Sequence, residues 1–412
     1  MASEVIEIEG HIIDSLTLAK VMDLIVAAGA DYEVLEVAIG KTNVDMSRAR
    51  LEVTAADQDA LQSLLDQLQI HGANRVMTGD AELVEADRDG VFPAGFYSTT
   101  NLPTAVRVGG RWLEVVQPEM DCGLVVRQGL GYEGQEQVVV APMHRIRVGD
   151  LVVVGTEGVR VSPPSPPRGA HPFEFMNSEV SSEKPKELLV HQVAARLRRA
   201  RANGLKILAV CGPAVIHTGA GPSIATLIRE GWIDVLFAGN GFATHDLESN
   251  VMGTSLGVSV KSGAAAEGGH SNHLRVINEI RRYGSIAAAV DAGYIDGGVM
   301  YECVHRGIPF VLGGSVRDDG PLPDVYSDVV EAADAMRYLI PGVGVALMLA
   351  STLHAIATGN LLPAGVETFC VDINPAVVTK LADRGSHQAL GIVTDVGLFT
   401  SGLLEQLLVA PE

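Results

Sequence analysis

The fold class of this chain is decided by the stretch Lys206-Ile207-Leu208-Ala209-Val210-Cys211-Gly212-Pro213, a short apolar run that ends in glycine and proline. An apolar run of this length, bounded by turn residues, is typical of a buried strand. The same strand-and-turn arrangement recurs downstream at Asp234–Gly241, Pro309–Gly314, Thr368–Asp372 and Gly391–Asp395. Strands that alternate with helical segments in this way predict an α/β domain with a doubly wound parallel sheet.

Two segments of different character precede this part of the chain. Residues 5–85 follow the order strand, helix, strand, strand, helix, strand, which is that of a ferredoxin-like βαββαβ module. Residues 87–167 contain short alternating strands separated by Gly and Pro, which predicts a small middle β domain followed by a Pro-rich linker. We therefore expect three domains, at residues 1–86, 87–185 and 186–412, the last of them Rossmann-like.

The composition favours a small molecule as the partner. Hydrophobic residues make up 47% of the 412 residues and aromatic residues only 5%, which suits buried parallel strands built from Val, Leu, Ile and Ala. The formal net charge of −20, with no run rich in Lys or Arg, argues against nucleic acid or an anionic membrane.

Neither the start of the chain nor its most apolar stretch predicts a targeting or membrane segment. The first residues carry Glu where a signal peptide needs positive charge. The apolar stretch Val343–Ile356 is interrupted by Ser351, Thr352 and His354, and it is too short to span a bilayer. We therefore expect the protein to stay in the cytoplasm.

The turns after the strands are the candidate ligand sites, because open parallel sheets bind ligands outside the carboxyl ends of their strands. The first turn contains Gly219 and Gly221 and then begins a helix. Glycines let backbone N–H groups approach a phosphate, and a helix N-terminus adds partial positive charge. No GxG pair completes a GxGxxG fingerprint, so dinucleotide binding and a purely structural turn both remain open at this position.

The second turn, Gly239–Asp246, is richer in polar groups. Asn240 and Gly241 are candidates to hold a nucleotide, and His245 and Asp246 are expected at the top of the next helix. Thr244 and Asp246 are also good helix-start residues, so helix capping is the alternative interpretation for them.

Two small turns follow. Thr254 lies in the first and is a further candidate to contact a cofactor. In the second, His270 and His273 are three residues apart, but no carboxylate or third histidine stands at ligand spacing. We therefore expect no metal, and we interpret the two histidines as candidates for capping or substrate contact.

The densest polar cluster is Gly313–Asp324, which directly follows an apolar strand. A solvated loop would explain its charges, but its position at a strand end favours a ligand role. Gly314 and Ser315 are candidate cofactor contacts, and Arg317 suits bidentate binding of a carboxylate. Asp318 or Asp319 could accept an ammonium group or ribose hydroxyls.

Two further acids end strands. Asp372 has the placement of an acid that accepts hydrogen bonds from ribose hydroxyls. Asn374, two residues on, is a candidate cofactor contact and, with Pro375 after it, a well-formed helix N-cap. Asp395 repeats the arrangement of Asp372 after the next strand, with capping as the alternative.

Five runs of residues together carry a family resemblance: Glu9–Asp14, Pro118–Cys122, Gly239–Gly257, Gly297–Glu302 and Leu312–Asp324. The chain resembles, over nearly its whole length, the conserved-region family of lysine-oxoglutarate reductase/saccharopine dehydrogenase (LOR/SDH) bifunctional enzymes. Members of this family include archaeal-type ornithine cyclodeaminases and the C-terminal part of cyanobacterial arginine dihydrolase/ornithine cyclodeaminases.

The resemblance implies an NAD-binding domain similar to that of deoxyhypusine synthase, with tightly held NAD. It places contacts to NAD at seven positions: Asn240, Gly241, Val299, Met300, Asp318, Asp372 and Asp395. The family has Asn-Ala at the second turn where this chain has Asn240-Gly241, a small change that leaves room for the cofactor.

The reaction that the resemblance implies converts L-ornithine to L-proline and ammonia by transient oxidation at the α-carbon, cyclisation and hydride return. The substrate carboxylate would be held by Arg317. The base would be Asp318 or Asp319, with His270 or His245 as alternatives. Two other functions stay open: an NAD-dependent amino- or imino-acid dehydrogenase, and a non-catalytic regulator that senses a dinucleotide. Homo-oligomers are usual for such enzymes, and we expect one here.

Overall fold

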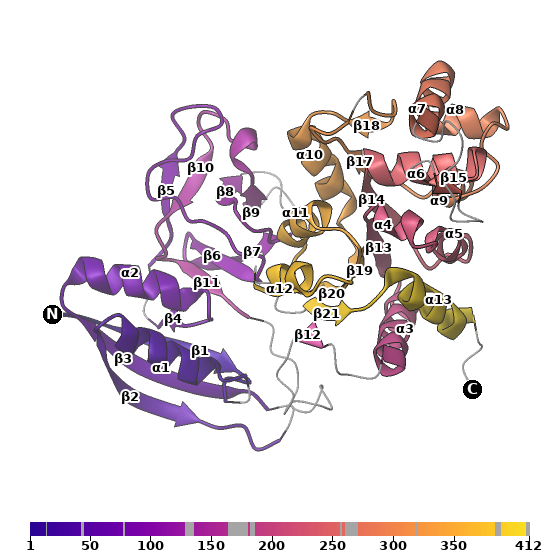
Figure 1. Cartoon of the computed structure of the whole chain (residues 1–412). Coiled ribbons are helices and arrows are strands. Elements are labelled where there is room, and N and C mark those ends of the chain that lie inside the picture. Colours follow the sequence, from indigo (N-terminus) through magenta and orange to yellow (C-terminus); the bar gives the residue numbers. More distant parts are fainter. Residues whose placement is uncertain are drawn as a thin grey trace. The chain divides into compact units, whose positions relative to one another are not determined.

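The structure, a computed structural model, describes residues 1–13, 15–42, 45–76, 79–127, 136–163, 180–181, 186–255, 258–259, 271–318, 320–383 and 389–408. The chain forms two compact units (Figure 1). The first unit comprises Met1–Asn177 and Leu362–Gly365, and the second comprises Ser178–Leu361 and Val366–Glu412. A short segment from late in the sequence therefore belongs to the N-terminal unit, where the backbone of Ala364 donates a hydrogen bond to the carbonyl of Asn101.

The first sheet of the N-terminal unit is antiparallel, with the strand order β2-β3-β1-β4. Buried and partly exposed residues alternate along β3, because successive side chains of a strand point to opposite faces of the sheet. The predicted βαββαβ order is confirmed by the elements β1 (Ala2–Gly10), α1 (Thr17–Ala27), β2 (Asp31–Ala38), β3 (Ser47–Ala55), α2 (Gln58–Gln69) and β4 (Asn74–Arg75).

The second sheet of this unit is mixed, with the order β11-β6-β7-β9-β8-β10-β5. It confirms the small β fold that the alternating pattern predicts. Its strands are β5 (Glu82–Glu85), β6 (Thr104–Val108), β7 (Arg111–Val116), β8 (Gly123–Arg127), β9 (Gln137–Ala141), β10 (Leu151–Val154) and β11 (Val159–Val161). The side chain of Gln69 donates a buried hydrogen bond of 2.8 Å to the carbonyl of Val159 and so joins the two sheets. The domain boundaries at residues 86 and 185 stay predictions.

The C-terminal unit contains a parallel sheet with the order β12-β21-β20-β19-β13-β14-β17-β18. All its pairings are parallel, which confirms the predicted α/β class. From β13 the chain order runs outward in one direction through β14 and β17, and in the other through β19 and β20. The sheet therefore reverses its winding between β13 and β19, and that point is where doubly wound sheets bind ligands.

The strands of this sheet are β12 (Val180–Ser181), β13 (Lys206–Cys211), β14 (Val235–Gly239), β17 (Phe310–Gly313), β18 (Val325–Tyr326), β19 (Val343–Leu349), β20 (Glu367–Asp372) and β21 (Ala389–Val393). A separate antiparallel pair is formed by β15 (Thr254–Ser255) and β16 (Val258–Ser259). The helices are α3 (Lys186–Ala202), α4 (Ala214–His217), α5 (Gly221–Arg229), α6 (Asn240–Val251), α7 (Asn272–Tyr283), α8 (Ile286–Asp291), α9 (Val299–Arg306), α10 (Val329–Leu339), α11 (Leu353–Leu361), α12 (Pro375–Asp383) and α13 (Val396–Leu408).

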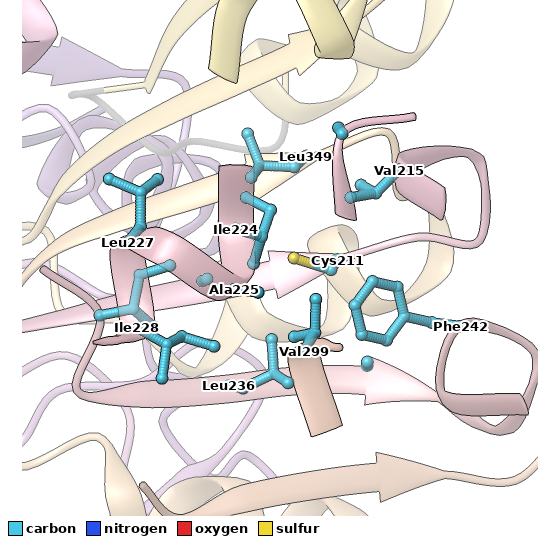
Figure 2. Close-up of a cluster of buried hydrophobic side chains, with 14 of the residues drawn as sticks. Cys211, Val215, Ile224, Ala225, Leu227, Ile228, Leu236, Phe242, Val299 and Leu349 are labelled. Carbon is cyan, nitrogen blue, oxygen red and sulfur yellow. The ribbon is translucent and has the colours of Figure 1, made fainter. Parts of the chain in front are cut away.

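Apolar side chains from strands and helices form the core of the C-terminal unit. Cys211, at the end of β13, lies among the side chains of Ile224, Phe242 and Val299, all of which are fully buried (Figure 2). The core fixes where β13 ends and α6 begins, so it also fixes the turns at the carboxyl edge of the sheet. In the described part of the chain, no helix combines the length and the apolarity that crossing a membrane requires.

Gly212 directly follows β13 and has no room for a side chain. A Cβ atom built on Gly212 would lie 1.8 Å from the carbonyl oxygen of Ala350, which is backbone and has no side-chain freedom to move away. We expect Gly212→Ala to lower the free energy of unfolding by about 1–3 kcal/mol or more, measured by urea denaturation.

The matched control is Gly365→Ala, because a Cβ at Gly365 meets nothing within 4 Å. Equal urea midpoints for the two variants would show that the close approach at Gly212 is not needed.

Candidate site at the carboxyl edge of the parallel sheet

The site is centred where β13 and β19 end side by side. Gly212 approaches the backbone of Ala350 so closely that no side chain fits between them. Ala350 has a φ of +47°, a left-handed conformation that is uncommon for residues other than glycine. Strained backbone at the winding reversal is typical of a functional turn.

His354 is a site residue that the sequence predictions missed. It belongs to α11, and its ring packs against two strand ends, since a Cβ on Gly239 or Gly313 would lie 2.9 Å from the imidazole. Burial lowers the pKa of His354, although the carboxylate of Asp318 acts in the opposite direction. His354 is therefore held neutral beside two glycine-rich turns.

Three carboxylates lie at successive turns, and each uses one oxygen to fix its own turn. Asp318 accepts a hydrogen bond of 2.8 Å from the N–H of Ser315. Asp372 accepts a hydrogen bond of 2.8 Å from the N–H of Asn374, two residues later in the chain. Asp395 accepts one of 2.9 Å from the N–H of Leu398, three residues later. Among the residues that the structure describes, no donor contacts the second oxygen of any of these carboxylates. Each acid therefore has one oxygen left for a ligand.

The capping predictions for two of these turns are confirmed. Asn374 accepts a hydrogen bond of 3.0 Å from the N–H of Ala376 at the start of α12. Asp395 caps α13 through the N–H of Leu398. Capping by one oxygen leaves the other available, so the cap does not exclude a cofactor contact at Asp395, which stays a prediction.

The second turn differs from its prediction. The helix α6 begins at Asn240, so Thr244 and Asp246 lie inside the helix and do not cap its start. The side chain of Asn240 is buried, and its oxygen accepts a hydrogen bond of 3.0 Å from the N–H of Leu322. Gly241 lies beside Pro213 of the first turn, since a Cβ there would be 3.3 Å from the proline ring. Asn240 and Gly241 therefore connect three of the turns.

Asp246 caps a different helix. Its two carboxylate oxygens accept hydrogen bonds of 3.0 and 2.8 Å from the N–H groups of Val299 and Met300, the first residues of α9. Val299 and Met300 are fully buried. Because their N–H groups donate to Asp246, these two donors are not available to a cofactor. Cofactor contact at Val299 and Met300 stays a prediction.

The remaining predicted residues are distributed around the edge. Gly219 has a φ of +79° and open space around it, and Gly221 begins α5. Gly314 lies against the carbonyl of Tyr326, and Ser315 bonds to Asp318.

Arg317 lies on the surface, and Thr254 belongs to a polar network. Arg317 is exposed, and no described carboxylate forms an ion pair with it. Thr254 donates its hydroxyl to Glu248. Asp319 and His270 lie outside the described residues.

Burial raises the pKa of Asp246 to about 6, against the opposing effect of its backbone donors Met300 and Val299. Between about pH 6 and pH 4 the folded protein binds a proton here that the unfolded chain, with an ordinary pKa of about 3.9, does not bind. The contribution of Asp246 to the free energy of unfolding therefore increases as the pH falls through that window.

The measurement compares the melting temperatures of the wild type and Asp246→Asn at pH 7.5 and pH 5. The melting temperature of the wild type minus that of Asp246→Asn should be larger at pH 5 than at pH 7.5. Asp291→Asn, an exposed change on α8, should show no such shift. The same pH response in Asp246→Asn as in the wild type would contradict the assignment.

The fold and this edge define the class of the protein. A doubly wound parallel sheet with glycine turns and carboxylates at its winding reversal is a Rossmann-type nucleotide-binding arrangement. Comparison with known proteins agrees with this class. Residues 191–403 match the family described as arginine dihydrolase ArgZ-like, C-terminal, Rossmann fold. Residues 3–102 match the LOR/SDH bifunctional enzyme conserved region, and residues 103–190 match the ArgZ-like C-terminal first region.

Relatives align along the whole chain. The ornithine cyclodeaminase of Methanopyrus kandleri is 51% identical over 98% of this chain and 97% of its own length. The crystal structure of apo ArgZ, an arginine dihydrolase from the ornithine–ammonia cycle in cyanobacteria, is 40% identical over 98% of this chain, with a TM-score of 0.84. AgrE, solved as a ternary complex with ornithine and NAD+, is 44% identical over 98% of this chain, with a TM-score of 0.53.

The chain belongs to this LOR/SDH and ArgZ-like C-terminal family. It spans 58% of the ArgZ chain and 57% of the AgrE chain.

Proposed function

We propose that this chain is an NAD-dependent ornithine cyclodeaminase, which converts L-ornithine to L-proline and ammonia at the carboxyl edge of its parallel sheet. The observation that carries the proposal is the full-length identity of 51% with the Methanopyrus kandleri ornithine cyclodeaminase. Because that identity extends over all three matched regions, it concerns the whole catalytic unit and not an isolated nucleotide-binding module.

The residues at the sheet edge fit a nicotinamide nucleotide. Gly239 and Gly313 end their strands without side chains, and this lets the imidazole of His354 lie against both strand ends. The second oxygens of Asp372 and Asp395 suit ribose hydroxyls, which are hydrogen-bond donors. When bound, the nicotinamide accepts two electrons from the substrate and returns them after ring closure.

The protein's own residues hold the amino acid. Arg317 is exposed at the turn after β17, and its planar guanidinium suits the substrate carboxylate. Asp318 has an oxygen available for an ammonium group or for a proton. Asp319, His270 and His245 remain the other candidates for the base.

The reaction itself is tested with purified protein, ornithine and no added cofactor. We expect proline and ammonia in equal amounts, and NAD in the supernatant after the protein is denatured. The rival dehydrogenase would instead need added NAD and would accumulate the absorbance of reduced nicotinamide. NAD binding without ammonia release from any amino acid would support the regulatory alternative.

The cofactor site is tested at Asp372. Asp372→Asn keeps an oxygen for the N–H of Asn374 but removes the charge that strengthens the bonds to ribose. A hydrogen bond to a charged group contributes about 1.5–3 kcal/mol, so NAD affinity should fall by about 10- to 100-fold.

The measurement is calorimetric titration of nucleotide-free protein, with the exposed Asp296→Asn as the control. Unchanged affinity in Asp372→Asn would remove Asp372 from the cofactor site.

The proposed enzyme is a cytoplasmic homo-oligomer. The strand β2 lies at the edge of the first sheet and exposes Val34, Leu35 and Val37 by 44, 49 and 43%. An exposed apolar edge strand is a ready site for pairing with a second copy.

A further inference from the structure

A chain of hydrogen-bonded polar side chains runs from α6 through β15 to α7. His245 and Glu248 are one turn apart on α6, and Nδ1 of His245 lies 3.1 Å from Oε2 of Glu248. The other oxygen of Glu248 accepts a hydrogen bond of 2.8 Å from the hydroxyl of Thr254. Asn272 of α7 donates to that hydroxyl at 2.9 Å. This arrangement fixes the carboxylate from the side away from the histidine.

Glu248 is fully buried, so its charge depends on the donors around it. When Glu248 is ionised it only accepts hydrogen bonds, and Nδ1 of His245 then carries the proton that it donates. In the neutral ring the lone pair is then on Nε2. A carboxylate that orients a histidine in this way is the usual arrangement of a general base.

A second histidine lies next to the first. The ring centroid of His217, at the end of α4, is 4.7 Å from that of His245, and the rings are tilted by 59°. Nδ1 of His217 lies 2.8 Å from the hydroxyl of Ser255. Burial lowers the pKa of His217, and so does the neighbouring His245, whereas Glu248 raises it. His217 is accessible to solvent, so the network connects a buried carboxylate with the surface.

The pair lies close to the winding reversal. Thr218 directly follows His217. A Cβ atom built on Gly397 would lie 3.1 Å from the carbonyl oxygen of Thr218, and the same atom would also meet the carboxylate of Asp395. His245 follows Asn240 by little more than one turn of α6. Both histidines therefore come from helices that follow strand ends at the carboxyl edge of the sheet, α4 after β13 and α6 after β14.

Ornithine cyclisation needs a group that accepts a proton and gives it back. The substrate carries two ammonium groups and one carboxylate, and the products are zwitterionic proline and ammonium, so no proton is consumed overall. The δ-nitrogen must lose a proton as its bond to the oxidised α-carbon forms. The α-nitrogen must gain a proton as its own bond to that carbon breaks and ammonia leaves.

We propose that His217 and His245 are this proton-transfer pair, and that Glu248 positions His245 and stabilises the pair while it holds the proton. The inference rests on the proposed ornithine cyclodeaminase function and assigns its ring-closure step. The proton moves from the δ-nitrogen to the pair and then to the departing α-nitrogen. The electrons that leave and return to the α-carbon are not affected by this transfer.

The test uses the variants His217→Gln and His245→Gln in the purified protein with its own nucleotide. We expect ammonia release to slow by about 100- to 10,000-fold, which is the usual contribution of a general acid–base group. Ornithine should still reduce the bound nicotinamide, and its absorbance should persist because the next step is blocked. His305→Gln, on the exposed face of α9, is the control and should behave like the wild type.

The outcomes separate this inference from the proposed function. A wild type that forms no proline contradicts the function itself. A wild type that forms proline while both variants retain its rate overturns the proton-transfer pair. Variants that bind ornithine but no longer reduce the nicotinamide overturn it as well, because they place the residues before ring closure.

A readout without turnover tests the coupling of the two rings. In protein labelled with 13C-histidine, replacing His245 by Gln should raise the pKa of His217, because His245 lowers it in the wild type. Glu248→Gln should lower the pKa of His217 and reduce kcat with little change in KM. A His217 titration that neither variant moves would overturn the coupling.

Discussion

The contact between the backbone of Gly212 and the carbonyl of Ala350 is the constraint on which the rest of the site depends. It occurs where β13 and β19 end and the sheet reverses its winding. With no side chain between them, the two turns start from adjacent points and diverge. The crevice that forms at such a point is where doubly wound sheets bind their ligands.

The polar groups around this edge hold the turns in place, and the proposed function gives some of them a second role. Asp318, Asp372 and Asp395 each fix a turn with one oxygen and leave the other available. Asp246 differs from them, because both of its oxygens hold the start of α9 and none is left for a ligand. The three carboxylates that the proposed function assigns to ligands thus differ from the structural Asp246 in having a second oxygen without a backbone donor.

The pattern of the sequence predicted most of the fold. The strand at Lys206–Cys211 is confirmed at both ends, because a short apolar run before glycine and proline allows few alternatives. β19 was missed, although Val343–Leu349 is an apolar run bounded by Pro341-Gly342 and Ser351. The run continues into α11 with similar hydrophobicity, and periodicity alone does not separate a buried strand from a buried helix.

Missing β19 also hid His354, which follows it. The pairing of His217 with His245, and of Asp246 with Val299, could not be predicted at all. These contacts join residues far apart in the sequence, and only the crossing of elements at the sheet edge brings them together. The spacing of residues along a short stretch of sequence does not indicate contacts between residues that are far apart in the chain.

Amide hydrogen exchange, measured with and without bound NAD, tests the central claim most directly. If the turns at the winding reversal hold the nucleotide, NAD should slow exchange in residues 212–221, 350–354 and 372–374 and leave α2 of the other unit unchanged. Protection confined to other segments, or none at all, would contradict the account.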